Sequence, residues 1–105
     1  MTRSRLLPAL LTALCVTVPS AAGCAGSPTW EMPDVVGVDL QSAQDTVQVL
    51  TNFGVPVTSH DRTGAGRMQV VDAEWRVCEQ IPAAGTDLTE DSMIDLGVVL
   101  KDEAC

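Results

Sequence analysis

The sequence predicts an α+β fold in which one helix packs on a three-stranded antiparallel sheet, preceded by a signal peptide. Its 105 residues suffice for one small domain. Apolar residues recur at helical spacing between positions 40 and 53, and three extended segments follow at 55–59, 75–80 and 93–100. A helix and a sheet each have one apolar face, and packing the two together buries both.

The first 23 residues have the layout of a secretory signal peptide. Arg3 and Arg5 form a positive start, an apolar run spans residues 6–18, and small residues follow at 20–23. The apolar run is shorter than the roughly 20 residues that a membrane-spanning helix needs. We therefore expect the chain to be exported and this segment to be removed.

The end of the signal peptide, Ala21-Ala22-Gly23-Cys24, resembles the lipobox of bacterial lipoproteins, in which the cysteine thiol receives a diacylglycerol group and becomes the new amino terminus. The alternative is ordinary cleavage after Ala22, which suits the small residues at positions 20 and 22 and would give a secreted protein. The two alternatives differ in the number of cysteines that they leave unpaired.

Cysteine counting favours lipidation at Cys24. Cys15 leaves with the signal peptide, so plain secretion would leave three thiols, one of them unpaired, in an oxidising compartment. Lipidation of Cys24 leaves Cys78 and Cys105, which can pair with each other. A disulfide between them would stabilise a small core by roughly 3 kcal/mol and would make Cys78 a structural residue.

The predicted mature chain, from residue 24 onward, is strongly acidic. All 14 acidic residues lie in it against four basic ones, so its net side-chain charge is −10. Such a surface repels nucleic-acid phosphates and anionic lipid headgroups, which excludes nucleic-acid binding and leaves acyl chains as the means of membrane attachment.

Residues 24–31 are predicted to be a short tether and residues 32–105 the folded domain, which opens with an extended segment at 32–37. The strongest element is a helix over 40–53. Asp39 is its predicted N-cap and Gly54 the predicted left-handed residue after its end. Its apolar face is expected to consist of positions 40, 43, 47, 50 and 53.

Strands and turns follow the helix. Pro56 indicates that the first strand, 55–59, lies at a sheet edge. The later segments are predicted to be a polar loop at 60–66, a short extended piece at 68–73, a half-buried strand at 75–80, a turn at 82–85 and the last strand at 93–100.

Two motifs resemble those of the PASTA domain, which occurs in bacterial receptor kinases and penicillin-binding proteins. They are Met32-Pro33-Asp34-Val35-Val36-Gly37 and Gln80-x-Pro82-Ala83-Ala84-Gly85-Thr86, with Ala43, Leu50 and Gly54 between them. The resemblance covers about residues 32–100. It implies a helix on a three-stranded sheet, outside the cell, associated with peptidoglycan or wall-synthesis proteins. Trp75 stands where the family usually has glycine, and the cysteine pair is not part of its pattern.

No catalytic or metal-binding arrangement is predicted. Ser59, His60 and Asp61 contain the residue types of a catalytic triad, but adjacent residues of an extended chain point to opposite sides, so His60 is interpreted as a solvated loop residue. Cys78 and Cys105 lack the spacing of a zinc site. The acidic residues near the last strand lack the spacing of a calcium loop and are interpreted as a solvated face; they are Asp87, Glu90, Asp91 and Asp95.

The predicted function is a non-enzymatic, cofactor-free binding module, lipid-anchored on the outer side of the cell membrane, with plain secretion as the alternative location. It is expected to bind cell-wall peptidoglycan or its precursors. The alternative is a protein-interaction module that docks on a cell-wall synthesis enzyme or receptor kinase. Trp75 is the candidate ligand-binding residue if its ring faces outward, although its strand position favours the core. Trp30 lies just before the domain.

Overall fold

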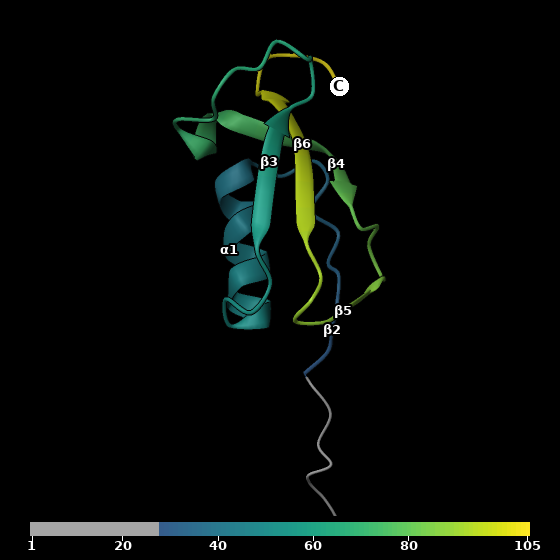
Figure 1. Ribbon diagram of the computed structural model, residues 1–105. Coiled ribbons are helices and arrows are strands. Elements are labelled where there is room, and N and C mark those ends of the chain that lie inside the picture. Colours follow the sequence, from purple (N-terminus) through teal and green to yellow (C-terminus); the bar gives the residue numbers. More distant parts are fainter. Residues whose placement is uncertain (1–27) are drawn as a thin grey trace, which may run out of the picture.

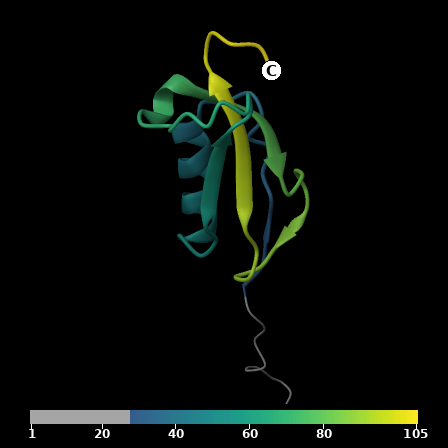
Figure 2. The same cartoon turned by 45° about the horizontal axis from the view of Figure 1, so that its top comes forward.

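A computed structural model describes residues 28–105; the predicted signal peptide at 1–23 and the predicted lipidation site Cys24 lie outside the described residues. One helix packs on one face of a three-stranded sheet, as predicted (Figures 1 and 2). In chain order the elements are β2 (Trp30–Glu31), α1 (Leu40–Thr51), β3 (Val57–Asp61), a 3₁₀ turn (Asp72–Glu74), β4 (Trp75–Ile81), β5 (Asp87–Leu88) and β6 (Ile94–Leu100). Within this part of the chain no helix has the length and apolarity needed to cross a membrane.

The predicted start of α1 is confirmed, whereas its predicted end is wrong in detail. Asp39 caps the helix, because its carboxylate accepts hydrogen bonds from the Ser42 backbone N–H at 3.0 Å and from the Ser42 hydroxyl at 2.8 Å. At the other end Asn52 and Phe53, and not Gly54, adopt the left-handed conformation, with φ of 53° and 61°. Asparagine tolerates this conformation better than other non-glycine residues, and it ends the helix one residue after Thr51.

Gly54 is required for a different reason from the one predicted. A Cβ atom at this position would lie 2.9 Å from the Thr51 carbonyl oxygen and 3.1 Å from the indole of Trp30. The ring of Trp30 therefore packs against the end of α1, and β2 pairs with β5 through Trp30–Leu88 and Glu31–Asp87. Trp30 and Glu31, which the sequence assigned to the tether, are thus part of the folded structure.

The buried face of α1 is shorter than the apolar pattern predicted. Leu40, Ala43 and Val47 are fully buried, but Leu50 is 42% exposed and Phe53 74% exposed. The next inward position after Val47 is Thr51, four residues on, as the helical repeat requires. Thr51 is 1% exposed, and its hydroxyl donates to the Val47 carbonyl at 2.9 Å, so its polar group is satisfied within the helix.

The sheet is mixed, not antiparallel as predicted. Its order is β3–β6–β4, with β3 parallel and β4 antiparallel to the central β6. The connection from β3 to β4 crosses one end of the sheet, so these two strands run in opposite directions, and β6 then returns between them (Figure 1). A strand antiparallel to β4 is therefore parallel to β3. Strands that follow one another in the sequence are commonly neighbours and then run antiparallel, but here β6 lies between β3 and β4. The edge position of β3, indicated by Pro56, is confirmed.

Two loop predictions also change. β3 continues through His60 and Asp61, which were predicted to begin a polar loop. Residues 68–73 do not form a strand, and a 3₁₀ turn precedes β4 instead. Both differences arise at the end of the sheet where the β3–β4 connection crosses, because contacts made by Asp61 and Arg67, described below, hold that connection in place.

The core lies between α1 and the inner face of the sheet. The helix contributes Leu40, Ala43 and Val47 to it. The sheet and the connecting segments supply the other members of the main cluster, which are Met32, Val35, Val55, Trp75, Val77, Leu88, Ile94, Leu96 and Val98. Burying each side chain of leucine or valine size contributes about 1.5–3 kcal/mol before conformational entropy is counted.

The side chain of Gln80 joins the two sequence motifs. Its Oε1 accepts a hydrogen bond from the Val35 N–H at 2.8 Å, and its Nε2 donates to the carbonyls of Pro33 at 2.9 Å and Pro82 at 3.1 Å. Backbone bonds between Met32 and residues 85 and 86 continue this contact. The opening segment and the turn after β4 therefore form one unit, which explains why the two motifs occur together.

Replacing Gln80 by glutamate is expected to lower the free energy of unfolding at pH 7 by about 1–3 kcal/mol, the cost of mispaired buried polar groups. One carboxylate oxygen would face the carbonyls of Pro33 and Pro82, so the pKa of the new carboxyl would be raised. The penalty is therefore present above that raised pKa and fades as the pH falls through it. Urea unfolding at pH 7 and pH 4.5 measures this. Gln44→Glu, on α1, adds the same charge as a control; equal losses in the two variants would contradict the role of Gln80.

Candidate functional site

The face of the sheet opposite α1, called here the outer face, is the candidate binding surface. Strand residues alternate between the two faces, and the pairing register groups the outward residues into rows across the sheet. One row contains Thr58, Asp95 and Ile81. The next contains His60, Gly97 and Glu79. The last contains Val99 and Arg76, with Arg62 just beyond β3.

Gly97 allows polar side chains from the two flanking strands to meet over the central strand. His60 Nε2 lies 3.6 Å from Glu79 Oε2, and His60 Nδ1 lies 2.8 Å from Asp95 Oδ2. A Cβ atom on Gly97 would lie 2.5 Å from Glu79 Cγ, where atoms cannot approach. Glu79 also accepts from Arg62 Nε at 2.9 Å. These side chains are each about half exposed.

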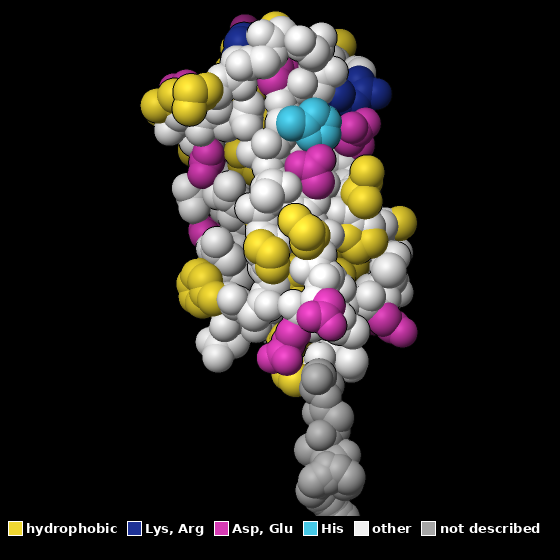
Figure 3. Space-filling model, viewed as in Figure 1, with side chains coloured by type: hydrophobic (Ala, Val, Ile, Leu, Met, Phe, Trp, Pro, Cys, Tyr) yellow, Lys and Arg dark blue, Asp and Glu magenta, His cyan; other side chains and the backbone are white. Residues whose placement is uncertain are grey.

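Apolar side chains adjoin this polar group. Ile81, which is in the same row as Asp95, is 64% exposed, and Met93, which precedes β6, is 69% exposed. Figure 3 shows the histidine next to acidic side chains, with hydrophobic side chains nearer the end of the molecule where β2 and β5 lie. The outer face thus combines hydrogen-bonding groups with a hydrophobic area, as ligand-binding surfaces commonly do.

Residues 101–105, called here the strap, fold back over one end of the outer face. A disulfide joins Cys105 to Cys78 on β4, with an S–S distance of 2.03 Å, which confirms the predicted pairing. Cys78 lies at a bulge between Val77 and Glu79. Val99, which points to the outer face, is only 1% exposed although it lies outside the main core cluster. We attribute its burial to the strap, which is tied down beside it.

Arg67 links the strap to the fold. Its guanidinium lies 2.8 Å from Asp61 Oδ2 and 2.9 Å from Glu103 Oε1, and its Cζ lies 5.1 Å from the centre of the Trp75 ring. The Arg67 guanidinium holds the pKa of Asp61 well below its usual range, with further hydrogen bonds from Thr63 and from the Arg67 backbone. Hydrogen bonds from Arg67, and then from the Leu100 N–H, lower the pKa of Glu103 as well.

The lowered pKa values of Asp61 and Glu103 predict a loss of stability in acid. A carboxyl whose pKa is lower in the folded state stabilises the fold above its unfolded pKa, about 4, and this contribution disappears as the pH falls further. The melting temperature is therefore expected to decrease progressively below about pH 4. The double variant Asp61→Asn/Glu103→Gln should have a lower melting temperature than the parent protein at pH 6. Its melting temperature should fall less than that of the parent between pH 4 and pH 2. Thermal unfolding measures this. If the melting temperature fell equally between pH 4 and pH 2 in the parent protein and the variant, this assignment would be contradicted.

The predicted ligand candidate Trp75 is in the core. It is 4% exposed, with the Arg67 guanidinium over its ring, so no free face remains for stacking on a ligand. His60 lies on a strand beside Asp95 and not in a solvated loop, which corrects the prediction. Ser59 does not converge with it, because its hydroxyl donates to Gln69 on another part of the chain, at 2.9 Å.

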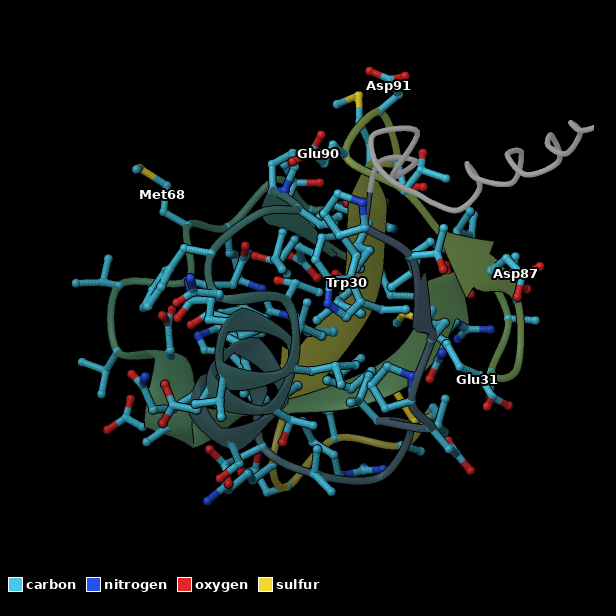
Figure 4. All side chains as sticks on the ribbon, turned by 90° about the horizontal axis from the view of Figure 1, so that it is seen from below. Trp30, Glu31, Met68, Asp87, Glu90 and Asp91 are labelled. Carbon is cyan, nitrogen blue, oxygen red and sulfur yellow. A yellow bond between two sulfur atoms is a disulfide. The ribbon has the colours of Figure 1, made fainter. Side chains whose placement is uncertain are left out.

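The acidic residues near the last strand do not form one group. Asp95 lies on the outer face, whereas Figure 4 shows Asp87 beside Glu31 on one side of the end of the molecule where Trp30 packs, and Glu90 with Asp91 on another side. Within residues 28–105, no three histidine, cysteine or acidic side chains are grouped so that they could hold a metal ion.

Comparison with protein-family models matches residues 31–99 to the PASTA domain. The chain belongs to the PASTA family. Searches of curated proteins and of solved structures gave no match. The matched region begins within β2 and ends one residue before the end of β6, so the helix–sheet unit is the PASTA domain.

Family membership makes the domain an extracytoplasmic module of a kind related to peptidoglycan binding. The Gln80 contacts lie within the matched region and unite its two motifs. The strap lies beyond it: Cys78 is inside the PASTA domain and Cys105 outside. Sequence reasoning missed the Arg67 contacts and the row formed by His60, Gly97 and Glu79. The alternation of Thr58, His60 and Arg62 was a signal for an outward-facing polar edge.

Proposed function

We propose that this protein is a non-catalytic, lipid-anchored PASTA module that binds cell-wall peptidoglycan or its precursors through its outer face. The observation that carries the proposal is the family match over residues 31–99. No helix or strand of the described residues covers the face of the β3–β6–β4 sheet opposite α1 (Figure 1). No nucleophile converges on His60: its neighbours are carboxylates, and the Thr58 hydroxyl donates to Asp95 at 2.9 Å.

The outer face suits an uncharged glycan with attached short peptides. Carboxylates and the imidazole hydrogen-bond with sugar hydroxyls and peptide amides, and exposed aliphatic side chains pack on the apolar faces of sugar rings. His60, Glu79 and Asp95 provide the first kind of group, and Ile81 and Met93 the second. The net side-chain charge of −10 that the chain carries from residue 24 onward disfavours anionic wall polymers as ligands.

Binding is tested by retention of the mature protein on purified peptidoglycan sacculi at physiological salt. We expect retention, and we expect Ile81→Ser to weaken it by about fivefold or more, because loss of an apolar interface anchor costs over about 1 kcal/mol. Val49→Ser is the matched control, since Val49 is also exposed but lies on α1. Equal weakening in both variants would place binding elsewhere, and no retention of the parent protein would refute the proposed ligand.

The proposed anchor is a lipid on Cys24. Only five residues separate Cys24 from Trp30, which packs on the domain, so the anchor would hold the module within about 20 Å of the membrane surface. Labelling with a radioactive fatty acid tests this: label should enter the parent protein and disappear in Cys24→Ala. Label that persists in Cys24→Ala would refute lipidation at this site.

A second candidate is a protein-interaction module, and exposed apolar side chains away from the outer face favour it. Val49 on α1, Phe53 just after its end, and Met68 and Val70 in the β3–β4 connection are each more than 70% exposed. Apolar residues at this exposure are typical of protein-binding surfaces when they lie together. If sacculi do not retain the protein, crosslinking in cells should capture a wall-synthesis enzyme or receptor kinase from Phe53 and not from Ile81.

A further inference from the structure

We propose that the strap is a reducible cover, and that its release by a dithiol opens an arginine site for carboxylate ligands on the outer face. This goes beyond peptidoglycan binding, because it assigns a second, regulated site. The site is formed by Arg62 and Arg76, whose guanidinium groups now bind strap atoms: Arg62 Nη1 donates to the backbone oxygen of Cys105, and Arg76 Nη2 donates to that of Glu103.

Most of the positive charge of the domain is directed at the strap. The described residues include four basic side chains, and three of them, the arginines, contact residues 103–105. In a domain that is otherwise acidic, the three arginines gather at the end of the sheet where the strap folds back. The strap contributes backbone oxygens and a carboxylate to these arginines, so it occupies them as an acidic ligand would.

Release of the strap would free the Arg76 guanidinium and the Arg62 Nη1, while Arg62 Nε stays bound to Glu79 at 2.9 Å. Arg67 would stay bound to Asp61, through contacts of 2.8 Å and 3.2 Å that do not involve the strap. Guanidinium groups bind carboxylates with paired hydrogen bonds, which makes a carboxylate-bearing molecule the fitting ligand class.

The fold does not need the strap for its core. The family match ends at residue 99, and the main core cluster contains no residue of the strap. Release would uncover Val99, one side chain on the outer face, while Leu96 and Val98 stay buried against α1. The strap is therefore an addition to the PASTA domain that can leave it without dismantling the helix–sheet packing.

The disulfide is placed for thiol exchange. Cys105 is exposed, and Arg76 Nη1 lies 3.2 Å from its sulfur. A thiolate of the dithiol attacks the Cys78 sulfur, the S–S bond breaks, and Cys105 leaves as a thiolate that the Arg76 guanidinium stabilises. The second thiolate of the dithiol then attacks the mixed disulfide. Cys78 leaves as a thiolate, and the dithiol, oxidised by two electrons, becomes a cyclic disulfide; both protein thiolates take up protons from water.

Arginine modification by phenylglyoxal, located by mass spectrometry, tests the proposal on the mature protein at 15 °C. After reduction with dithiothreitol and removal of the reagent under argon, Arg62 and Arg76 should react about tenfold faster, the factor for losing one hydrogen bond to a charged group. Arg67 is the internal control: it loses its contacts with Glu103, but its Nε and Nη2 stay bound to Asp61, so its rate should rise less than those of Arg62 and Arg76. Citrate is the carboxylate probe: it should slow modification of Arg62 and Arg76 in the reduced protein and leave the oxidised protein unchanged.

Each other outcome would overturn the proposal. If thiol titration finds two thiols but the rates of Arg62 and Arg76 are unchanged, the strap stays in place without its disulfide. If all three arginines become reactive and circular dichroism shows loss of structure, the disulfide holds the fold and not a cover. If the two arginines become reactive but citrate gives no protection, the site does not bind carboxylates. Cys78→Ala/Cys105→Ala, tested in the same way, should reproduce the reduced state.

Discussion

Leu40→Ala is expected to lower the free energy of unfolding by about 2–5 kcal/mol, whereas Leu50→Ala, the same change on the same helix, should cost less than about 1 kcal/mol. Leu40 is fully buried in the main core cluster, so its truncation loses apolar burial and leaves a cavity. Leu50 is 42% exposed and lies outside that cluster, and alanine favours the helix at least as strongly as leucine.

Urea unfolding of the two variants and the parent protein measures the difference. The two substitutions remove the same atoms from the same helix. The difference between their unfolding free energies therefore reports the difference in burial and not in side-chain chemistry or helix propensity. Far-ultraviolet circular dichroism of the folded baselines checks that α1 persists in each. Similar losses from both substitutions would mean that Leu50 is buried as the sequence pattern predicted, and that the packing face described for α1 is incorrect.

The helix shows how far sequence reasoning reaches. Its first turn was predictable because the determinants are local: Asp39 caps it through Ser42, three residues away. Its last turn was not, because the inward position at 51 is a threonine. A polar side chain is buried there since its hydroxyl bonds the Val47 carbonyl, and an apolar pattern cannot register such a residue. Phe53 continues the apolar spacing but belongs to the left-handed end of the helix and points to solvent.

The topology of the sheet depended on information that strand patterns do not contain. The segments that form β3, β4 and β6 were all found, with ends shifted by one or two residues. The order and direction of the strands were not found, because the alternation of residues along β6 is the same whichever strands lie beside it. β2 and β5 were missed because each has two residues, too few for any periodicity to appear.

The outer face was predictable only in part, for the same reason. The disulfide followed from counting cysteines, which needs no geometry. His60 and Asp95 are 35 positions apart in the sequence and become neighbours only through the parallel pairing of β3 with β6. Had the parallel arrangement been known, the alternation along both strands would have placed the two side chains on one face, in adjacent rows.

Removing the disulfide with Cys78→Ala/Cys105→Ala is expected to lower the free energy of unfolding by about 3–4 kcal/mol. The two cysteines are 27 positions apart, and the cross-link stabilises the fold by restricting the unfolded chain over that distance. A domain of this size has a total stability of roughly 4–12 kcal/mol, so the loss is a large share of it. The variant should remain folded near 15 °C, where stability is close to its maximum, and should melt at a lower temperature than the parent protein.

Urea unfolding should also show a steeper dependence on denaturant in this variant, because its unfolded chain, without the cross-link, exposes more surface. Glu103→Gln in the oxidised protein is the control: it weakens the contact between the strap and Arg67 but keeps the disulfide, so its loss should be smaller and the slope unchanged. If the two variants lost equal stability at the same slope, the strap contacts and not the cross-link would be the source of stabilisation. Reduction would then act on the folded state directly, through the hydrogen bonds between the strap and the arginines.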